Sequence, residues 1–186
     1  MAGTGKTEQD EEDYHVHLLS VNFHSLQVVS RPSVPSSSSS CKWALQRTRD
    51  RRTSLMVVKR LEVMGLAVAV DRKEKYLRFL LDDGSGACIP CILWLNLLSL
   101  TPRLNQSHLH CAVTTQVQAE LSVEEASKVR LGSLIRVQGR PSSFNGNLQV
   151  TVSSLQVESD PNAELLHWLD CMRLALRNYG LVAVQH

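Results

Sequence analysis

One stretch of the chain decides its fold: residues 61–94, which read LEVMGLAVAVDRKEKYLRFLLDDGSGACIPCILW. Three runs in it, 62–70, 75–81 and 88–95, are rich in the aliphatic and aromatic residues that favour strands. Polar turns separate them, and the second turn, residues 82–86 (DDGSG), contains residues that tolerate a positive φ. The stretch therefore predicts a three-stranded meander.

Two further strands follow after a gap. Ser122 can cap a helix that Gly132 ends. Residues 133–139 then alternate between apolar and polar side chains, and Asn145-Gly146 is a hairpin turn that leads into a last strand at 148–153. Three strands, a helix and two strands is the chain order of an OB barrel, a fold that binds single-stranded nucleic acid. We therefore predict an all-β core: a five-stranded OB-fold barrel with a helix between strands three and four.

A C-terminal helix is predicted over residues 160–179. Asp160 is a favoured N-cap, Pro161 is favoured at the first helical position, and Gly180 ends the helix. Apolar residues recur along this helix at helical spacing and form a wide apolar face. A closed barrel does not need a long apolar helix for its own core, so this face is expected to bind a partner as well. The predicted partner interface consists of Leu165, Trp168, Leu169, Met172, Leu176 and Tyr179.

The rest of the chain is assigned by composition. Residues 1–13 are polar and acidic and are predicted to be a disordered tail; 14–180 form a single OB-fold domain, and 181–186 a short tail. Within the domain, 14–29 favours a strand, whereas 31–54 is predicted to be a Ser/Arg-rich loop. The arginines of that loop suit a nuclear-entry signal, a phosphate-binding arm or simply a solvated loop.

Composition places the protein inside the cell. No apolar run approaches the roughly 20 residues that span a bilayer, so no membrane is expected. The first residues lack the basic and apolar regions of a secretory signal, and five scattered cysteines suit the reducing cytosol or nucleus. The net charge of +2 is too small to indicate nucleic-acid binding by itself, so a basic groove would have to be local.

No catalytic, cofactor or metal site is predicted. Gly3-Thr4-Gly5-Lys6-Thr7 lacks the upstream glycine and strand of a phosphate-binding loop. Cys88 and Cys91 form a CxxC within a predicted strand, where their side chains point to opposite faces, so free thiols are expected. No second cysteine pair follows at zinc-ribbon spacing, and no nucleophile–base set or carboxylate pair stands at a recognisable spacing.

Positive charges and flat rings recur on strands two to four and on the loop after strand four. Single strands are bound by ring stacking together with phosphate neutralisation. The alternative is a solvated barrel exterior with aromatic residues in the core. The predicted nucleic-acid-binding residues are Lys75, Tyr76, Arg78, Trp94, Arg136, Arg140 and Phe144.

Five stretches also resemble a known family. They are VMGLAVAV (63–70), LRFLLDDGSG (77–86), CILWLN (91–96), IRVQGRPSSFNG (135–146) and DPNAELLHWLDCMRL (160–174). They are similar to the Stn-one subunit of the CST telomere-capping complex, in its short plant-type form. The resemblance implies that the C-terminal helix joins a small OB-fold Ten-one subunit, as the middle subunit of replication protein A joins its small one. It also implies a place in the nucleus at telomeres, beside the large CST subunit, single-stranded telomeric DNA and polymerase alpha–primase.

The resemblance carries over to four of the predicted DNA-binding positions: Trp94, Arg136, Arg140 and Phe144. The sequence departs from the family pattern at Gln138 and Asn145, where arginines are expected. Fewer arginines put strong, autonomous DNA binding in doubt, because each lost phosphate contact weakens affinity. The prediction is a non-enzymatic, single-stranded-DNA-binding subunit that protects chromosome ends and supports C-strand fill-in. A pure assembly scaffold and an RNA-binding OB module remain as alternatives.

Overall fold

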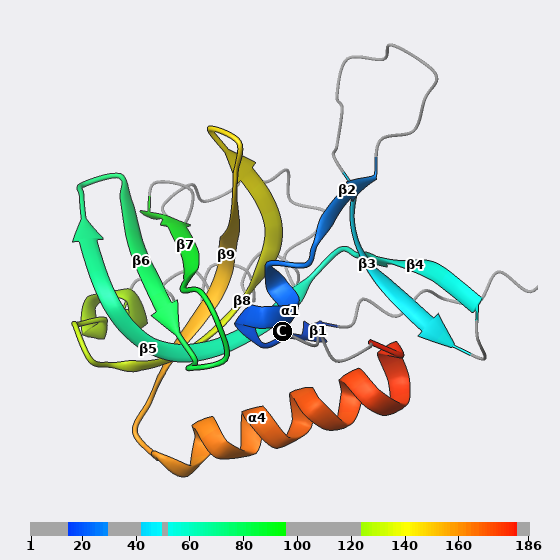
Figure 1. The fold of residues 1–186 in the computed structure, drawn as a ribbon. Coiled ribbons are helices and arrows are strands. Elements are labelled where there is room, and N and C mark those ends of the chain that lie inside the picture. Colours follow the sequence, from blue (N-terminus) through cyan, green and yellow to red (C-terminus); the bar gives the residue numbers. More distant parts are fainter. Residues whose placement is uncertain (1–14, 30–41, 50–51, 96–123, 182–186) are drawn as a thin grey trace, which may run out of the picture.

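The computed structural model describes residues 15–29, 42–49, 52–95 and 124–181. The predictions for 1–13, the serine run of the loop, Ser122 and 182–186 lie outside these residues. Within the described chain, five strands form a barrel that stands above a long helix in Figure 1. The strands are β5 (Leu61–Arg72), β6 (Tyr76–Asp82), β7 (Ile89–Trp94), β8 (Leu134–Phe144) and β9 (Asn147–Glu158).

The barrel closes because β5 is long enough to pair with two neighbours. Its first half pairs with β8 and its second half with β6, both antiparallel. β6 pairs with β7, β7 pairs with β9 in parallel, and β9 returns to β8. Gly65 lies where β5 changes partner, and a Cβ there would lie 2.6 Å from the backbone oxygen of Asp82. This strand order confirms the predicted five-stranded OB-fold barrel.

The interior of the barrel consists of the apolar side chains that alternate along these strands. Ile135 and Val137 are fully buried, as the alternation of 133–139 predicts. Removing one such aliphatic side chain from water stabilises the fold by about 1.5–3 kcal/mol. Leu61, Val63, Leu77, Leu81, Ile89 and Val150 complete this core, each with no measurable exposure.

The N-terminal segment forms less strand than predicted. Only β1 (Val16–His17) and β2 (Gln27–Val29) are extended, and α1 (Ser20–Phe23) turns the chain between them. The Ser20 N–H donates a 2.7 Å hydrogen bond to Oδ2 of Asp83, which holds this turn against the loop after β6. The strand preference of 14–29 therefore holds at 16–17 and 27–29, whereas 20–23 is helical.

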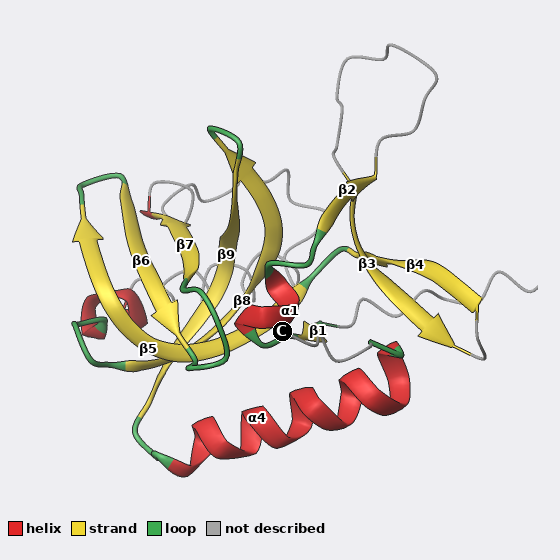
Figure 2. Cartoon of the chain, viewed as in Figure 1, coloured by secondary structure: helices red, strands yellow, loops and turns green. Residues whose placement is uncertain are grey.

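The predicted loop at 31–54 is also wrong in its second half. β3 (Lys42–Arg49) and β4 (Arg52–Val58) form an antiparallel hairpin that joins β2 in a separate three-stranded sheet, seen beside the barrel in Figure 2. Trp43 pairs with Val58 and Leu45 with Met56, and all four side chains are buried. The apolar face of this hairpin outweighs the basic residues that suggested a loop.

The C-terminal helix agrees with the prediction. α4 (Asn162–Leu174) continues as a π-helical turn, η2 (Ala175–Tyr179), and Gly180 ends it with a φ of 60°. Figure 1 shows α4 along the bottom of the barrel, and its end is fixed to β3 because the Thr48 N–H donates to the Gly180 carbonyl. Leu181, placed in the tail by the prediction, is buried.

Before β8, residues 124–128 are helical. In the described chain, no helix combines the length and apolar character needed to cross a bilayer.

Candidate nucleic-acid and partner interfaces

An open groove of about 420 Å³ lies between the outer faces of β5 to β7 and the β8–β9 hairpin. OB folds bind oligonucleotides at this place, across strands two and three and between the first and last hairpin loops. The wall of the groove is mostly apolar, and one guanidinium stands within it. Its lining includes Val70, Arg78, Leu80, Pro90, Phe144 and Leu148.

Arg78 is held between two aromatic rings in this groove. Its guanidinium carbon lies 4.8 Å from the ring centre of Tyr76 and 5.0 Å from that of Phe144. These are cation–π distances. Trp94 extends the cluster by packing its ring against Tyr76, edge to face, with 5.8 Å between the centres. Among the residues that the structure describes, Arg78 has no carboxylate partner, and its buried Nε has no hydrogen-bond partner.

Two more of the predicted cations are exposed around this cluster. Lys75 lies in the turn between β5 and β6, next to Tyr76. Arg140 lies on β8 four residues before Phe144, and therefore on the same face of that strand. Phe144 itself is 48% exposed beside the β8–β9 turn. The structure thus brings together a ring-and-charge cluster made of Tyr76, Arg78, Trp94 and Phe144, with Lys75 and Arg140 as exposed cations on the neighbouring turn and strand.

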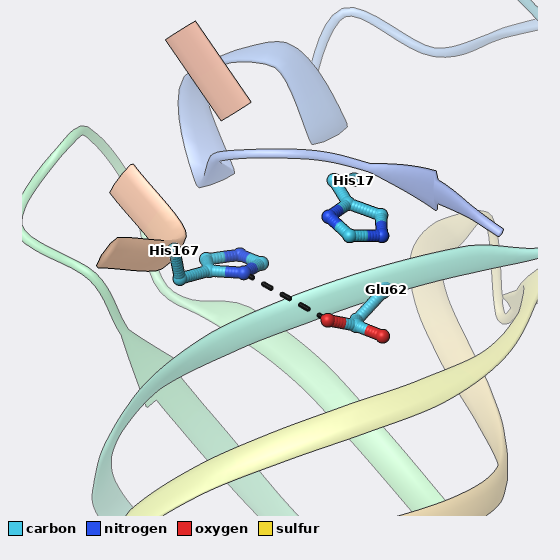
Figure 3. A group of neighbouring side chains, drawn as sticks. All are labelled: His17, Glu62 and His167. Atoms are coloured by element: carbon cyan, nitrogen blue, oxygen red, sulfur yellow. Dashed lines mark ion pairs between the residues drawn. The ribbon is translucent and has the colours of Figure 1, made fainter. Parts of the chain in front are cut away.

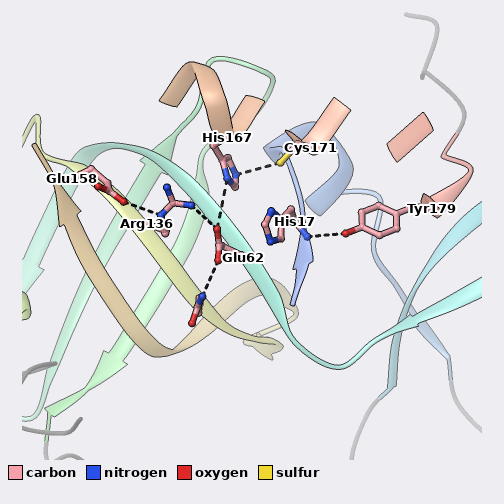
Figure 4. Close-up of polar contacts among 8 residues, drawn as sticks. His17, Glu62, Arg136, Glu158, His167, Cys171 and Tyr179 are labelled. Carbon is pink, nitrogen blue, oxygen red and sulfur yellow. Dashed lines mark hydrogen bonds and ion pairs between the residues drawn. The ribbon is translucent and has the colours of Figure 1, made fainter. Parts of the chain in front are cut away.

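Arg136 does not join this cluster. Its NH1 donates to Glu62 at 2.7 Å and its Nε donates to Glu158 at 2.9 Å, as Figure 4 shows. Both carboxylates already compensate the guanidinium charge, so Arg136 is a poor candidate for a phosphate contact. Sequence reasoning missed this pairing because Glu62 and Glu158 lie on different strands, far from Arg136 along the chain.

Glu62 is the centre of a buried polar network. Burial tends to raise the pKa of this carboxyl, but hydrogen bonds from Gln138 and Arg136 outweigh it and hold the pKa below its ordinary value. His167 of α4 approaches from the other side, with Nδ1 3.9 Å from Glu62 Oε1. Burial lowers the pKa of His167 to about 4, so this histidine is neutral near pH 7.

The inner face of α4 attaches it to the barrel. His167, Cys171 and Tyr179 are buried, and the Tyr179 hydroxyl accepts a hydrogen bond from the backbone N–H of His17. Trp168 is half-buried and donates its ring N–H to the Asp83 carbonyl at 2.9 Å. Tyr179 therefore belongs to the core, and Trp168 is mainly an attachment to the barrel. Both differ from their predicted place on the partner interface.

The opposite face of α4 presents an apolar stripe to solvent. Leu165, Leu169, Met172 and Leu176 recur at intervals of three and four residues, so they fall on one side of the helix. Their exposed fractions run from 42% for Met172 to 73% for Leu176. Leu166, which sequence reasoning left out of the interface, is 60% exposed beside them. We call these five residues the α4 stripe.

Similar proteins are found among solved structures and among curated sequences. No family model matches the sequence. The solved S. pombe Stn1–Ten1 complex aligns over 65% of this chain and 74% of that one, with a TM-score of 0.48 and 19% identity. A replication protein A heterotrimer bound to single-stranded DNA aligns over 72% and 86%, with a TM-score of 0.47 and 18% identity.

Sequence relatives are more informative. The mouse CST complex subunit STN1 is 22% identical over 129 residues, and the match covers only 34% of that longer protein. The STN1 subunit of Arabidopsis thaliana is 38% identical over 124 residues, which is 66% of this chain and 73% of that protein. This chain therefore belongs to the STN1 family of CST complex subunits.

Proposed function

We propose that this chain acts as the OB-fold subunit of a telomere-capping complex and binds both a protein partner and single-stranded DNA. α4 docks a small OB-fold Ten-one subunit, and the barrel groove contacts the DNA. The assembly includes the large CST subunit, lies at telomeres in the nucleus, and protects chromosome ends while supporting C-strand fill-in by polymerase alpha–primase. The name of the Arabidopsis relative supports this assignment.

The α4 stripe is the observation that carries the proposal. Five large apolar side chains stand side by side on a face that the barrel leaves uncovered. A contiguous exposed apolar patch usually marks an interface. Because the exposed fractions of these side chains range from 42% to 73%, covering each one would gain about half, or somewhat more, of the 1.5–3 kcal/mol of a full burial. The stripe could therefore supply roughly 4–7 kcal/mol before the costs of association.

The test is to place two charges in the stripe. Leu169→Glu with Met172→Glu should abolish co-purification of the small OB-fold subunit from nuclei and leave the barrel folded, because both side chains point to solvent. Leu131→Glu is the matched control: Leu131 is 70% exposed in the turn before β8, outside α4. It should retain the partner. Retention by the double variant, or loss of its cooperative thermal melt, would reject this assignment.

DNA contact rests on the ring-and-charge cluster. Arg78 offers a charge that forms no ion pair within the described chain, and Tyr76, Trp94 and Phe144 offer ring surfaces beside it. Stacking on such rings contributes about 1–3 kcal/mol per base. The groove suits a short single strand better than a duplex, because bases must be unstacked to reach the rings.

The neutralised Arg136 favours a second candidate, a pure assembly scaffold. Oligonucleotide titrations in the presence of the small subunit distinguish the two. Affinity for single-stranded DNA that falls with salt supports the DNA-binding subunit, whereas no affinity supports the scaffold. A marked preference for ribose would instead favour an RNA-binding module, since the 2′-hydroxyl is the group that separates the two nucleic acids.

A further inference from the structure

We propose that His17, Glu62 and His167 form a Zn²⁺ site that fastens the N-terminal strand and α4 to the barrel. Each residue offers one ligand atom, and these atoms all lie within 4.8 Å of one another. Figure 3 shows the two imidazole rings and the carboxylate converging from three elements: β1, β5 and α4.

The ligand set has the chemistry that zinc prefers. Zn²⁺ binds imidazole nitrogen and carboxylate oxygen, and two histidines with one glutamate leave a fourth position for water. Calcium and magnesium prefer oxygen ligands, so they fit this set poorly. The three residues belong to no spacing motif, because they come from the two ends of the chain and from the first barrel strand.

Two unpartnered nitrogens support the proposal. Nδ1 of His17 and Nδ1 of His167 are buried and have no hydrogen-bond partner in the described structure. The two rings stack with their centres 5.9 Å apart, so the imidazoles of β1 and α4 lie side by side. A buried polar atom without a partner is costly, and native proteins rarely leave two together. A metal ion bound between the rings and the Glu62 carboxylate would give Nδ1 of His167 the partner that it lacks.

The distances are close to those of a metal site. Zinc bonds of about 2.0–2.2 Å to nitrogen and oxygen place tetrahedral ligand atoms about 3.4 Å apart. Nδ1 of His167 already lies 3.9 Å from Oε1 of Glu62. All three ligand atoms lie within 4.8 Å of one another, so binding zinc would draw them together by up to about 1.4 Å.

The surrounding residues orient the ligands. Arg136 donates to Oε1 of Glu62 and Gln138 donates to Oε2, which fixes the carboxylate while leaving lone pairs for a metal. Nε2 of His167 lies 3.3 Å from Sγ of Cys171. With the ring proton on Nε2, this N–H donates to the sulfur and Nδ1 keeps its lone pair. Metal-binding histidines usually have such a partner on the other nitrogen.

The proposed zinc would control how α4 is presented. His167 lies on the inner face of α4, opposite the α4 stripe. A bond from this side chain through zinc to β5 would hold the helix in position without covering the stripe. Metal would thus stabilise the partner-binding surface without contacting the partner.

The experiment measures zinc on the full-length chain. After chelation and dialysis, the protein should bind about one Zn²⁺ in a competition titration with a chromophoric chelator, and Co²⁺ should give a visible ligand-field spectrum. His17→Gln and His167→Gln should each lose this binding. His24→Gln is the matched control, because His24 is exposed and bonds only backbone carbonyls in the described chain. It should bind zinc normally.

A second variant and a second readout keep the test decisive if a ligand variant unfolds. Cys171→Ala removes only the partner of Nε2 and should weaken zinc about 10–100-fold. Zinc should raise the Tm of the wild-type chain and slow amide exchange in α4, since a ligand that binds only the folded state stabilises it. Absence of zinc binding in the wild-type chain, or equal binding by the folded His17→Gln variant, would overturn the proposal.

Discussion

Arg78 and Arg136 were both predicted to bind phosphates, and the structure separates them. Arg78 stands between Tyr76 and Phe144 without a described carboxylate partner, whereas Arg136 is paired with Glu62 and Glu158. We expect Arg78→Gln to weaken single-stranded DNA binding with altered salt dependence. Arg136→Gln should leave the salt dependence unchanged and destabilise the fold.

The magnitudes follow from counterion release. Each phosphate contact on a single strand contributes about 0.7 to the slope of log affinity against log salt. Loss of the Arg78 contact should flatten the slope by about 0.7 and weaken binding about fivefold at 0.1 M salt. Arg136→Gln leaves the buried Glu62 carboxylate without the cation that pairs with it, a loss of about 1–3 kcal/mol of folding stability. In a chain of this size, that lowers the Tm by roughly 2–4 °C per kcal/mol.

The assay is fluorescence anisotropy with a labelled single-stranded oligonucleotide at several salt concentrations, with the small subunit bound, and a thermal melt of each variant. Phe144→Ala completes the set: it removes a ring without a charge, so affinity should fall by about 1–3 kcal/mol with an unchanged slope. A flattened slope for Arg136→Gln together with an unchanged slope for Arg78→Gln would refute the reasoning. Unchanged affinity for Arg78→Gln and Phe144→Ala together would favour the scaffold.

Three further predictions test other parts of the structure. Tyr179→Phe removes the hydroxyl that accepts a hydrogen bond from the His17 N–H, so the free energy of unfolding should fall by about 1–3 kcal/mol. The small subunit should still bind, and loss of the complex would show that Tyr179 belongs to the partner interface. Gly65→Ala should lower the free energy of unfolding by about 1–3 kcal/mol, because the added Cβ would overlap the Asp82 carbonyl. Denaturant titration measures this loss, and an unchanged denaturation midpoint would contradict it. Burial raises the pKa of the Cys171 thiol to about 12, so alkylation at pH 8, followed by mass spectrometry, should modify half-exposed Cys88 well before Cys171.

Local sequence patterns predicted the barrel well because they depend on near neighbours. Alternation identified Ile135 and Val137 as inward-facing, and both are fully buried. Asn145 and Gly146 have φ values of 52° and 81°, as their predicted hairpin turn requires. The C-terminal helix ends at Gly180 as predicted, with the αL conformation that glycine readily adopts.

Tertiary structure decided which of these side chains meet. Helical spacing placed Tyr179 on the apolar stripe, but the π-helical turn and the position of β1 direct it to the core. Composition assigned 42–54 to a loop, whereas the pairing of Trp43 with Val58 makes a hairpin. Ion pairing also depends on the fold. The sequence shows that Arg136 is cationic, but only the fold brings it to Glu62.

The sequence by itself therefore determined the barrel, its turns and the helix, because alternation, capping and turn chemistry act over a few residues. Only the tertiary structure decided that Arg136 is ion-paired, which face of α4 is open, and that His17, Glu62 and His167 converge. The physical reason is that burial, ion pairing and metal coordination depend on groups brought together from distant parts of the chain. No local pattern records those distances.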